Sequence, residues 1–329
     1  MSFMKIETEL TSRLGCRYPI IVAPMFLVSN VAMVVAGSGA GAIGSFPALN
    51  ARPVSKLREW LHEIKNTTDN PYAVNLIVNR SNPYLEQQME ICLEARVPMI
   101  IASLGDPAEL IRRAHAVGSQ VYCDVIEEKH AEKAMSAGAD GLIAVTSGAG
   151  GHGGNISALV WIPYLKKRYP NVPIVAAGGI ANGRGLAAAI ALGAAGVSIG
   201  TRFIASEECR VAQGYKDAVV NSNPHDIVTT YKLDGVAANV INTPYVKRRG
   251  TQLNLIERAM FKNRRLRKLL MGMRALRSIP LLDQAVQGPT WKELWGAGQV
   301  AGLIDEVLPI AEIVNRIVAE YARVRESLP

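Results

Sequence analysis

The chain has 329 residues, of which 49% are hydrophobic and 19% are charged, and its formal net charge is +8. This length and composition allow a large buried core. The four cysteines lie far apart and form no C-x-x-C pair, which argues against a disulfide framework or a zinc site. No apolar run reaches the roughly 18–20 residues that cross a bilayer, and no signal peptide is recognisable. We therefore expect a cytoplasmic protein without a membrane span.

Short apolar runs alternate with helical patterns along the chain, which is typical of a parallel sheet built from βα units. The runs are continuously apolar, as in strands that are buried on both faces. The predicted strands are residues 20–23, 41–45, 72–76, 99–103, 120–125, 141–145, 173–176 and 196–200. The predicted helices between them are residues 54–64, 84–95, 108–117, 128–137 and 185–192. Eight such strands predict an α/β fold, a (β/α)₈ TIM barrel.

After the eighth strand the pattern predicts a helix at residues 212–220, an insertion at 222–294 and a closing helix at 309–325. We therefore predict a barrel formed by residues 1–221 and 295–329. The insertion is predicted to be mainly helical, because apolar residues recur at helical spacing between Ile256 and Leu276.

The positive charge of the chain is concentrated in the insertion. Residues 231–278 contain twelve lysines and arginines against Asp234 and Glu257, a net charge of +10, so the rest of the chain carries about −2. One interpretation is a solvated helix face, and the other is attraction of an anionic partner such as a phosphorylated carrier. Nucleic acid is a poorer candidate, since aromatic residues are not interleaved with these charges.

Two glycine motifs follow the seventh and eighth predicted strands. Ala177-Gly178-Gly179 ends the seventh strand, and Gly200-Thr201 ends the eighth. In TIM barrels these two loops commonly bind phosphate, because glycine lets backbone N–H groups approach the phosphate oxygens. The Thr201 hydroxyl and a helix N-terminus would add donors. These residues predict a phosphate site at the barrel mouth.

A run of small residues with one imidazole, 147–154, follows the sixth strand. It contains Gly151 and His152 on the face where barrel enzymes carry their active sites. A lone histidine is more often structural, but this one lies on an active-face loop, and histidine as a residue type can exchange protons near neutral pH. The run also matches G-x-G-x-x-G. However, no Asp or Glu occurs between Asp140 and Glu207, so the acidic ribose partner of a dinucleotide fold is missing. We predict that His152 is catalytic.

Ala23-Pro24-Met25 in the first loop and Asn75 at the end of the third strand complete the predicted site. A methionine can lie against a flat ring, and an asparagine can hydrogen-bond a heterocycle. Together with a phosphate site across the mouth, they predict space for a planar phosphorylated cofactor.

These motifs, with Gly44-Ser45-Phe46, Arg202-Phe203 and Trp295-Gly296-Ala297-Gly298-Gln299, resemble the nitronate monooxygenase family, formerly called 2-nitropropane dioxygenases. That family also includes FMN-dependent enoyl-acyl-carrier-protein reductases and some quinone reductases. The resemblance implies FMN, with its phosphate on Gly178, Gly179, Gly200 and Thr201. The isoalloxazine ring would lie near Ala23, Pro24, Met25 and Asn75, and Gly151 and Ala177 would be further contacts. His152 would face the substrate.

The chain departs from the family pattern at two points. Many relatives carry an acidic residue shortly before the glycine-glycine-histidine, where this chain has residues 147–150, and some carry a basic residue where it has Asp124. The first function expected is oxidation of alkyl nitronates with dioxygen to carbonyl compounds and nitrite. The alternative is NAD(P)H-dependent reduction of enoyl thioesters or quinones, for which the basic insertion is better suited. A phosphate-binding barrel without redox chemistry is a third hypothesis, and a homodimer is compatible with the sequence.

Overall fold

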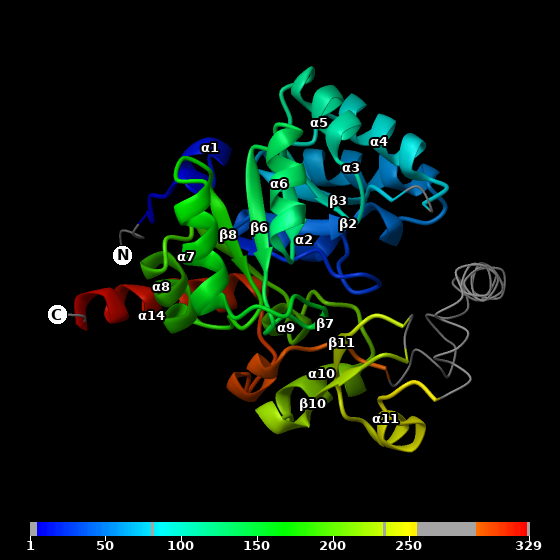
Figure 1. The fold of residues 1–329 in the computed structure, drawn as a ribbon, viewed down its shortest axis with the longest axis vertical. Helices are drawn as coiled ribbons and strands as arrows, with labels where there is room; N and C mark the ends of the chain where they lie inside the picture. The colour runs from blue at the N-terminus through cyan, green and yellow to red at the C-terminus, as the bar shows by residue number, and fades with distance from the viewer. Residues whose placement is uncertain (1–4, 80–81, 233–234, 255–293, 328–329) are drawn as a thin grey trace.

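The computed structural model describes residues 5–79, 82–232, 235–254 and 294–327. Within them, eight parallel strands form one sheet in the order β1-β9-β8-β6-β5-β4-β3-β2. The ends of the sheet also meet, since Ile21 and Ile43 form a parallel bridge and the Ile43 amide donates to the Ile20 carbonyl at 2.8 Å. The sheet closes into a barrel surrounded by helices (Figure 1), which confirms the predicted TIM-barrel fold.

The barrel elements alternate along the chain as the apolar runs predict. The strands are β1 (Ile20–Val22), β2 (Gly44–Pro47), β3 (Tyr72–Ile77), β4 (Met99–Ser103), β5 (Gln120–Val125), β6 (Gly141–Val145), β8 (Ile174–Ala177) and β9 (Gly196–Ile199). The main surrounding helices are α2 (Val31–Gly39), α3 (Ser55–Thr67), α4 (Leu85–Glu94), α5 (Ala108–His115), α6 (Glu128–Ser136), α7 (Ala158–Arg168), α8 (Gly183–Ala191) and α14 (Ile310–Ser327). Shorter elements are α1 (Glu9–Leu14), η1 (Ala48–Asn50), α9 (Thr201–Ile204), α10 (Gln213–Val220) and η3 (Gln299–Leu303).

Only β2 is clearly displaced from its prediction, beginning at Gly44 instead of residue 41. Gly41 has a φ of +90°, and its carbonyl accepts the amides of Arg17 and Tyr18 at 3.0 and 2.8 Å. The chain therefore turns at Gly41 and pairs briefly with β1 before it enters the strand proper.

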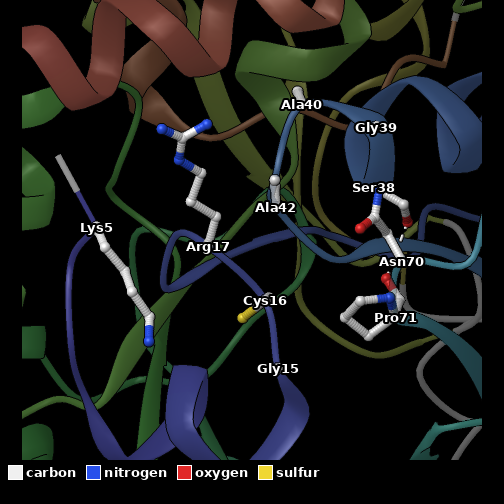
Figure 2. A pocket seen from close by; sticks show the side chains of 11 residues that line it. Lys5, Gly15, Cys16, Arg17, Ser38, Gly39, Ala40, Ala42, Asn70 and Pro71 are labelled. Carbon is white, nitrogen blue, oxygen red and sulfur yellow. Dashed lines mark hydrogen bonds between the residues drawn. The ribbon is translucent and has the colours of Figure 1, made fainter. Parts of the chain in front are cut away.

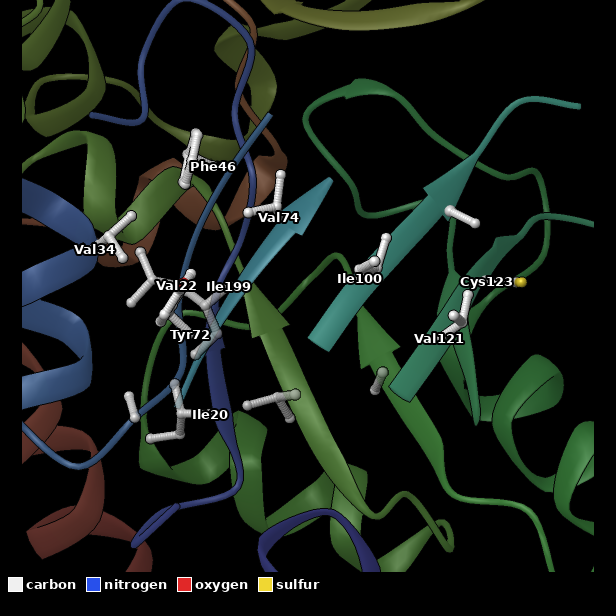
Figure 3. Close-up of a cluster of buried hydrophobic side chains, with 14 of the residues drawn as sticks. Ile20, Val22, Val34, Phe46, Tyr72, Val74, Ile100, Val121, Cys123 and Ile199 are labelled. Carbon is white, nitrogen blue, oxygen red and sulfur yellow. The ribbon is translucent and has the colours of Figure 1, made fainter. Parts of the chain in front are cut away.

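Side chains of the strands divide between two apolar layers, because successive residues of a strand point to opposite faces. The outer layer lies between the sheet and the helices, where Val22, Phe46 and Val74 pack beside Val34 of α2 (Figure 3). The inner layer fills the barrel with residues such as Ile101, Tyr122 and Ile143. Its amino-terminal end is closed by the fully buried Leu10 of α1, which leaves the carboxyl-terminal end as the place for a site.

A second, antiparallel sheet lies at the carboxyl-terminal end of the barrel (Figure 1). It consists of β7 (Gly151–His152), β11 (Ala238–Ile241) and β10 (Ile227–Thr230), and it is flanked by η2 (Pro224–Asp226) and α11 (Pro244–Arg249). The described part of the insertion therefore contributes two strands that the sequence analysis does not predict. The helical pattern between Ile256 and Leu276 lies outside the described residues, so the insertion's mainly helical character and its boundaries stay predictions.

Candidate active site

Most of the predicted site residues follow the carboxyl ends of barrel strands, and they come from two different sides of the mouth. The loops after β6, β8 and β9 form a glycine-rich side, whereas β3, β4 and β5 present inward polar side chains near their carboxyl ends. We call these the glycine side and the side-chain side. The first loop, after β1, lies next to β9 and connects the glycine side to the side-chain side.

On the glycine side, the loops after β6 and β8 touch through their backbones. Gly178 and Gly179 have φ values of +99° and +78°, which glycine adopts readily. A Cβ added to Gly178 would lie 2.5 Å from the Ala149 nitrogen, and the Gly179 amide donates to the Gly148 carbonyl at 3.1 Å. Both glycines are therefore favoured by backbone conformation, and Gly178 is also required by the close approach of the two loops.

Gly200 and Thr201 lie at the start of α9, directly after β9. The buried Thr201 hydroxyl oxygen accepts the Gly298 amide at 3.0 Å, which leaves its hydrogen free to be donated to a ligand. A Cβ on Gly200 would lie 3.5 Å from the Met25 sulfur, so the eighth loop and the first loop meet here. Within this short helix the Phe203 amide donates to the Gly200 carbonyl at 2.8 Å, which fixes the turn after β9.

The first loop is held from behind by an asparagine that the sequence analysis does not single out. Asn50 donates through Nδ2 to the carbonyls of Met25 and Ser29 at 3.0 and 2.8 Å, and its Oδ1 accepts the Leu27 amide at 2.9 Å. The Met25 amide donates to the Ser29 hydroxyl at 2.9 Å. Polar contacts thus fix residues 23–25 at the rim. In the sequence, the only sign of these contacts is an asparagine after a strand end.

On the side-chain side, three polar groups from adjacent strands form a connected series. Asn75 Nδ2 donates to the Ser103 hydroxyl at 2.6 Å and to the Ile101 carbonyl at 3.0 Å, and the Ser103 hydroxyl donates to Asp124 Oδ2 at 2.5 Å. Burial raises the pKa of Asp124 to about 6, and the hydrogen bond from Ser103 opposes that rise. Sequence reasoning identifies Asn75 and notes Asp124 only as a departure from the family, and it misses Ser103.

His152 lies in β7, which the second sheet holds over the glycine side. Ala238 of β11 pairs with His152, and Asn239 pairs with Gly151. His152 is exposed. Asn239 also donates through Nδ2 to the Ala149 and Ser147 carbonyls at 2.8 and 3.3 Å, so one side chain of the insertion fixes the loop after β6.

Asn239 is not among the predicted site residues. The available signal was a hairpin pattern, with two short runs at residues 227–230 and 238–241 that are separated by a glycine-containing stretch.

The family motif that begins at Trp295 also packs against the loop after β6. Trp295 stacks on Tyr215 of α10 with ring centroids 5.3 Å apart, and the Tyr215 hydroxyl donates to the Gly296 carbonyl at 2.5 Å. A Cβ on Gly150 would lie 2.8 Å from the Gly298 nitrogen. The backbone of residues 295–298 therefore packs against the glycine side and supports it.

Two further features lie away from the predicted cofactor position. Arg202 donates to the Glu306 carbonyl at 3.0 Å and is buried, so it ties α9 to the segment before α14. A shallow cavity of about 430 Å³ lies between Lys5, Arg17 and Cys16 on one side and Ser38, Asn70 and Pro71 on the other (Figure 2). Its lining residues precede β1, β2 and β3, so it lies at the opposite end of the barrel from the mouth.

Among the described residues, no group of three His, Cys, Asp or Glu is placed to hold a metal ion. No helix in the described ranges combines the length and apolarity needed to cross a membrane. All four cysteines, Cys16, Cys92, Cys123 and Cys209, are buried free thiols.

Known proteins share sequence similarity with most or all of this chain. The chain is 29% identical over 351 aligned positions to the (3aS,4S,5R,7aS)-5-hydroxy-7a-methyl-1-oxo-octahydro-1H-indene-4-carboxyl-CoA dehydrogenase of Rhodococcus jostii, with 98% of each chain covered. It is 30% identical to the probable nitronate monooxygenase of Staphylococcus saprophyticus, over 74% of this chain and 81% of that protein.

Solved structures of similar proteins have the same fold over nearly the whole chain. FabK from Thermotoga maritima superposes with a TM-score of 0.83 at 32% identity, covering 98% of both chains. The nitroalkane oxidase from Streptomyces ansochromogenes shares the fold, with a TM-score of 0.80 at 23% identity over 97% of this chain and 99% of that one.

The model of the family described as nitronate monooxygenase matches residues 7–320, which include every predicted site residue. The family match and the similarity to FabK cover nearly the whole chain and include both sides of the mouth. The chain belongs to the nitronate monooxygenase family of flavin-dependent oxidoreductases.

Proposed function

We propose that the chain binds FMN across the mouth, with the phosphate on the glycine side at Gly178, Gly179, Gly200 and Thr201. Two features of these residues support the proposal. Gly178 and Gly179 adopt positive φ values and carry no side chain, so the loop after β8 can lie against the loop after β6. The Thr201 hydroxyl keeps a hydrogen that it can donate to the phosphate. The stretch between Asp140 and Glu207 contains no carboxylate, which suits a dianionic phosphate.

The flavin ring would extend from this phosphate toward the side-chain side. Ala23, Pro24 and Met25 would lie along it, since the Met25 sulfur already lies close to Gly200, and Ala177 and Gly151 would border it. Asn75 would hydrogen-bond the far edge of the ring. When bound, FMN supplies the redox chemistry, and the protein contributes orientation, hydrogen bonds and exclusion of water.

His152 would act on the substrate above the ring. The backbone pairing of β7 with β11 fixes its position, and Asn239 fixes the loop that leads to it. An imidazole that titrates near neutral pH can hold an anionic oxygen when protonated or take a proton from carbon when neutral. This role depends on position, so it does not by itself select the substrate.

We infer that the substrate is an acyl thioester of coenzyme A or a related carrier. The main support is the order of elements after β7's partner strand. That strand, β11, leads directly into α11, whose last turn contains Lys247, Arg248 and Arg249. A cluster of cations on the helix that follows the second sheet suits the phosphates of such a carrier. The similarity to a carboxyl-CoA dehydrogenase over 98% of both chains, insertion included, supports this inference.

Oxidation of alkyl nitronates is the second candidate. The family match over residues 7–320 and the 30% identity to a probable nitronate monooxygenase favour it. That relative covers only 74% of this chain, whereas the carboxyl-CoA dehydrogenase covers 98%, and the small nitronate anion has no use for an extended basic surface.

The deciding experiment is bleaching of the flavin absorbance near 450 nm in purified protein under nitrogen. Separate samples receive NADH, NADPH or propyl-2-nitronate, and each reduced sample is then mixed with an enoyl-CoA. Reduction by a nicotinamide followed by reoxidation by the thioester supports thioester redox chemistry. Reduction by the nitronate alone, with recovery on admission of dioxygen, identifies the second candidate. Colourless protein that takes up no added FMN would refute both.

A matched pair of variants tests the basic surface. Replacing Lys247 and Arg249 by Gln should raise KM for an acyl-CoA about three- to tenfold, with a weaker dependence on salt, because two cations near the carrier are lost. Replacing Lys65 of α3 and Lys167 of α7 by Gln removes the same charge from the last turns of their helices, at the end of the barrel opposite the mouth. This control pair should leave KM unchanged. Equal effects of the two pairs would show that α11 does not contact the carrier.

A further inference from the structure

The upper interior of the barrel contains an ionisable side chain that the proposed mechanism does not use. Asp124 lies two residues after Tyr122 in β5, so both side chains point into the barrel. Tyr122 belongs to the buried inner layer, whereas Asp124 lies at the level of Asn75 and Ser103, beneath the mouth. Desolvating a carboxylate costs free energy unless its hydrogen bonds repay it, so its presence needs an explanation.

The hydrogen bonds from Asn75 to Asp124 have a fixed direction. The Ser103 hydroxyl has one hydrogen, which it donates to Asp124 Oδ2 at 2.5 Å, so its oxygen can only accept from Asn75 Nδ2 at 2.6 Å. The second hydrogen of Nδ2 goes to the Ile101 carbonyl at 3.0 Å. Both amide hydrogens of Asn75 are therefore committed inside the barrel wall, and the Oδ1 atom is the part of the amide left for a ligand.

We propose that Asp124, acting through Ser103, is a positioning residue that holds the Asn75 amide with its oxygen toward the mouth. The side-chain side then offers a hydrogen-bond acceptor and selects a ligand edge that carries a ring N–H. This inference depends on the proposed function for the identity of that ligand, because the pyrimidine edge of a flavin carries such an N–H.

The groups packed around Asp124 make it the only charge that acts on this series within the described residues. Ser103 on β4 is neutral, and on β6 the residue in register with Asp124 is Ile143. Cys123 on the same strand points outward, and burial raises the pKa of its thiol to about 12, so it is also neutral. The direction of the series therefore depends on whether Asp124 is ionised.

Protonation of Asp124 would weaken this arrangement. The neutral carboxyl is a poorer acceptor for the Ser103 hydroxyl and can itself donate to Ser103, so the amide of Asn75 is no longer held in one orientation. Because burial raises the pKa of Asp124 to about 6, the change falls in an accessible range between pH 5 and pH 8.

The test is titration of the apoprotein with FMN by fluorescence quenching at pH 8 and pH 5, for the unmodified chain and three variants. Ser103→Ala removes the link and should raise the Kd of FMN roughly tenfold at pH 8, the effect of about one hydrogen bond. Ser103→Thr keeps the hydroxyl and should restore the Kd to within about threefold. Asp124→Asn should raise the Kd at pH 8 and abolish part of its rise at pH 5.

The phosphate of FMN also titrates near pH 6, but that contribution is common to all four proteins and cancels in the comparison. Thermal midpoints of the apoproteins show whether a variant has failed to fold, and the threonine variant reports on the hydroxyl independently. If Ser103→Ala and Asp124→Asn bind FMN as the unmodified chain does at both pH values, the inference is overturned and the proposed cofactor stands. If the unmodified chain does not bind FMN, the proposed function fails as well.

Discussion

The two sides of the barrel mouth differ in composition, since one consists of glycine-rich backbone and the other of polar side chains. On the glycine side, loops after β6 and β8 approach so closely that a Cβ at Gly178 would lie 2.5 Å from a backbone nitrogen, and carboxylates are missing from the whole stretch between Asp140 and Glu207. On the side-chain side, β3, β4 and β5 present Asn75, Ser103 and Asp124 in one hydrogen-bonded series. Under the proposed function, this difference would give one side backbone donors for the phosphate and the other side an oriented acceptor for the ring.

The largest expected effect concerns the residue that stands above the glycine side. His152→Ala should keep FMN bound but lower turnover by roughly 10²–10⁴-fold, the usual range for loss of an acid–base group. The measurement is kcat with the substrate that reoxidises or reduces the flavin, beside the flavin content of the purified variant. Unchanged kcat would assign His152 a structural role in β7, and loss of flavin would place the imidazole at the cofactor instead.

A substitution within the glycine side should affect both stability and cofactor binding. Gly178→Ala places a Cβ at a φ of +99° and against Ala149, so we expect the free energy of unfolding to fall by about 2–5 kcal/mol and FMN affinity to drop sharply. Gly118→Ala is the matched control, since Gly118 has a φ of +81° but open space around its Cβ position. It should cost only about 1–2 kcal/mol and leave the FMN Kd unchanged. Similar losses in the two variants would mean that backbone strain alone, without close approach, explains Gly178.

Removing the charge from the side-chain side should stabilise the apoprotein. The folded pKa of Asp124, about 6, lies above the ordinary aspartate value of 3.8, so the fold disfavours the ionised form. The destabilisation is therefore present above pH 6 and disappears as the pH falls toward 4. Asp124→Asn should raise the free energy of unfolding by about 1–2 kcal/mol at pH 8, a value reduced for partial solvent screening, and by little at pH 4. Urea unfolding at the two pH values measures this difference, and a destabilised variant at pH 8 would contradict it.

The smallest expected effect concerns the contact between the insertion and the glycine side. Asn239→Ala should lower the free energy of unfolding by about 1 kcal/mol and kcat/KM a few-fold, because two carbonyls of the loop after β6 lose their donor. Thr229→Val, which removes only the hydroxyl that donates to Asn239 Oδ1 at 2.8 Å, should have a weaker effect in the same direction. Amide hydrogen exchange in residues 147–151 should rise in the first variant, and unchanged exchange would show that β7 pairing alone fixes the loop.

Much of the barrel could be predicted from the sequence because its signals are local. Continuous apolar runs separated by helical patterns gave strands such as residues 99–103, 120–125 and 141–145 with the bounds that the structure has. The placement of Gly178, Gly200, Asn75 and the loop that carries His152 at one end of the barrel also followed from chain order, since all parallel strands end on the same side. Their assignment to FMN stays a proposal.

Contacts between distant segments could be settled only by the tertiary structure. The sequence shows Ser103, Asp124 and Asn75 as isolated polar residues at three strand ends, and only the pairing of β3, β4 and β5 brings them within hydrogen-bonding distance. In the same way, Asn239 reaches Ala149 across 90 residues of sequence, and Gly298 reaches Thr201 across 97. Local pattern determines which elements form and where each ends, because it depends on the burial of neighbouring side chains. The direction of a hydrogen bond or the closeness of two loops depends on barrel closure, which no short stretch of sequence encodes.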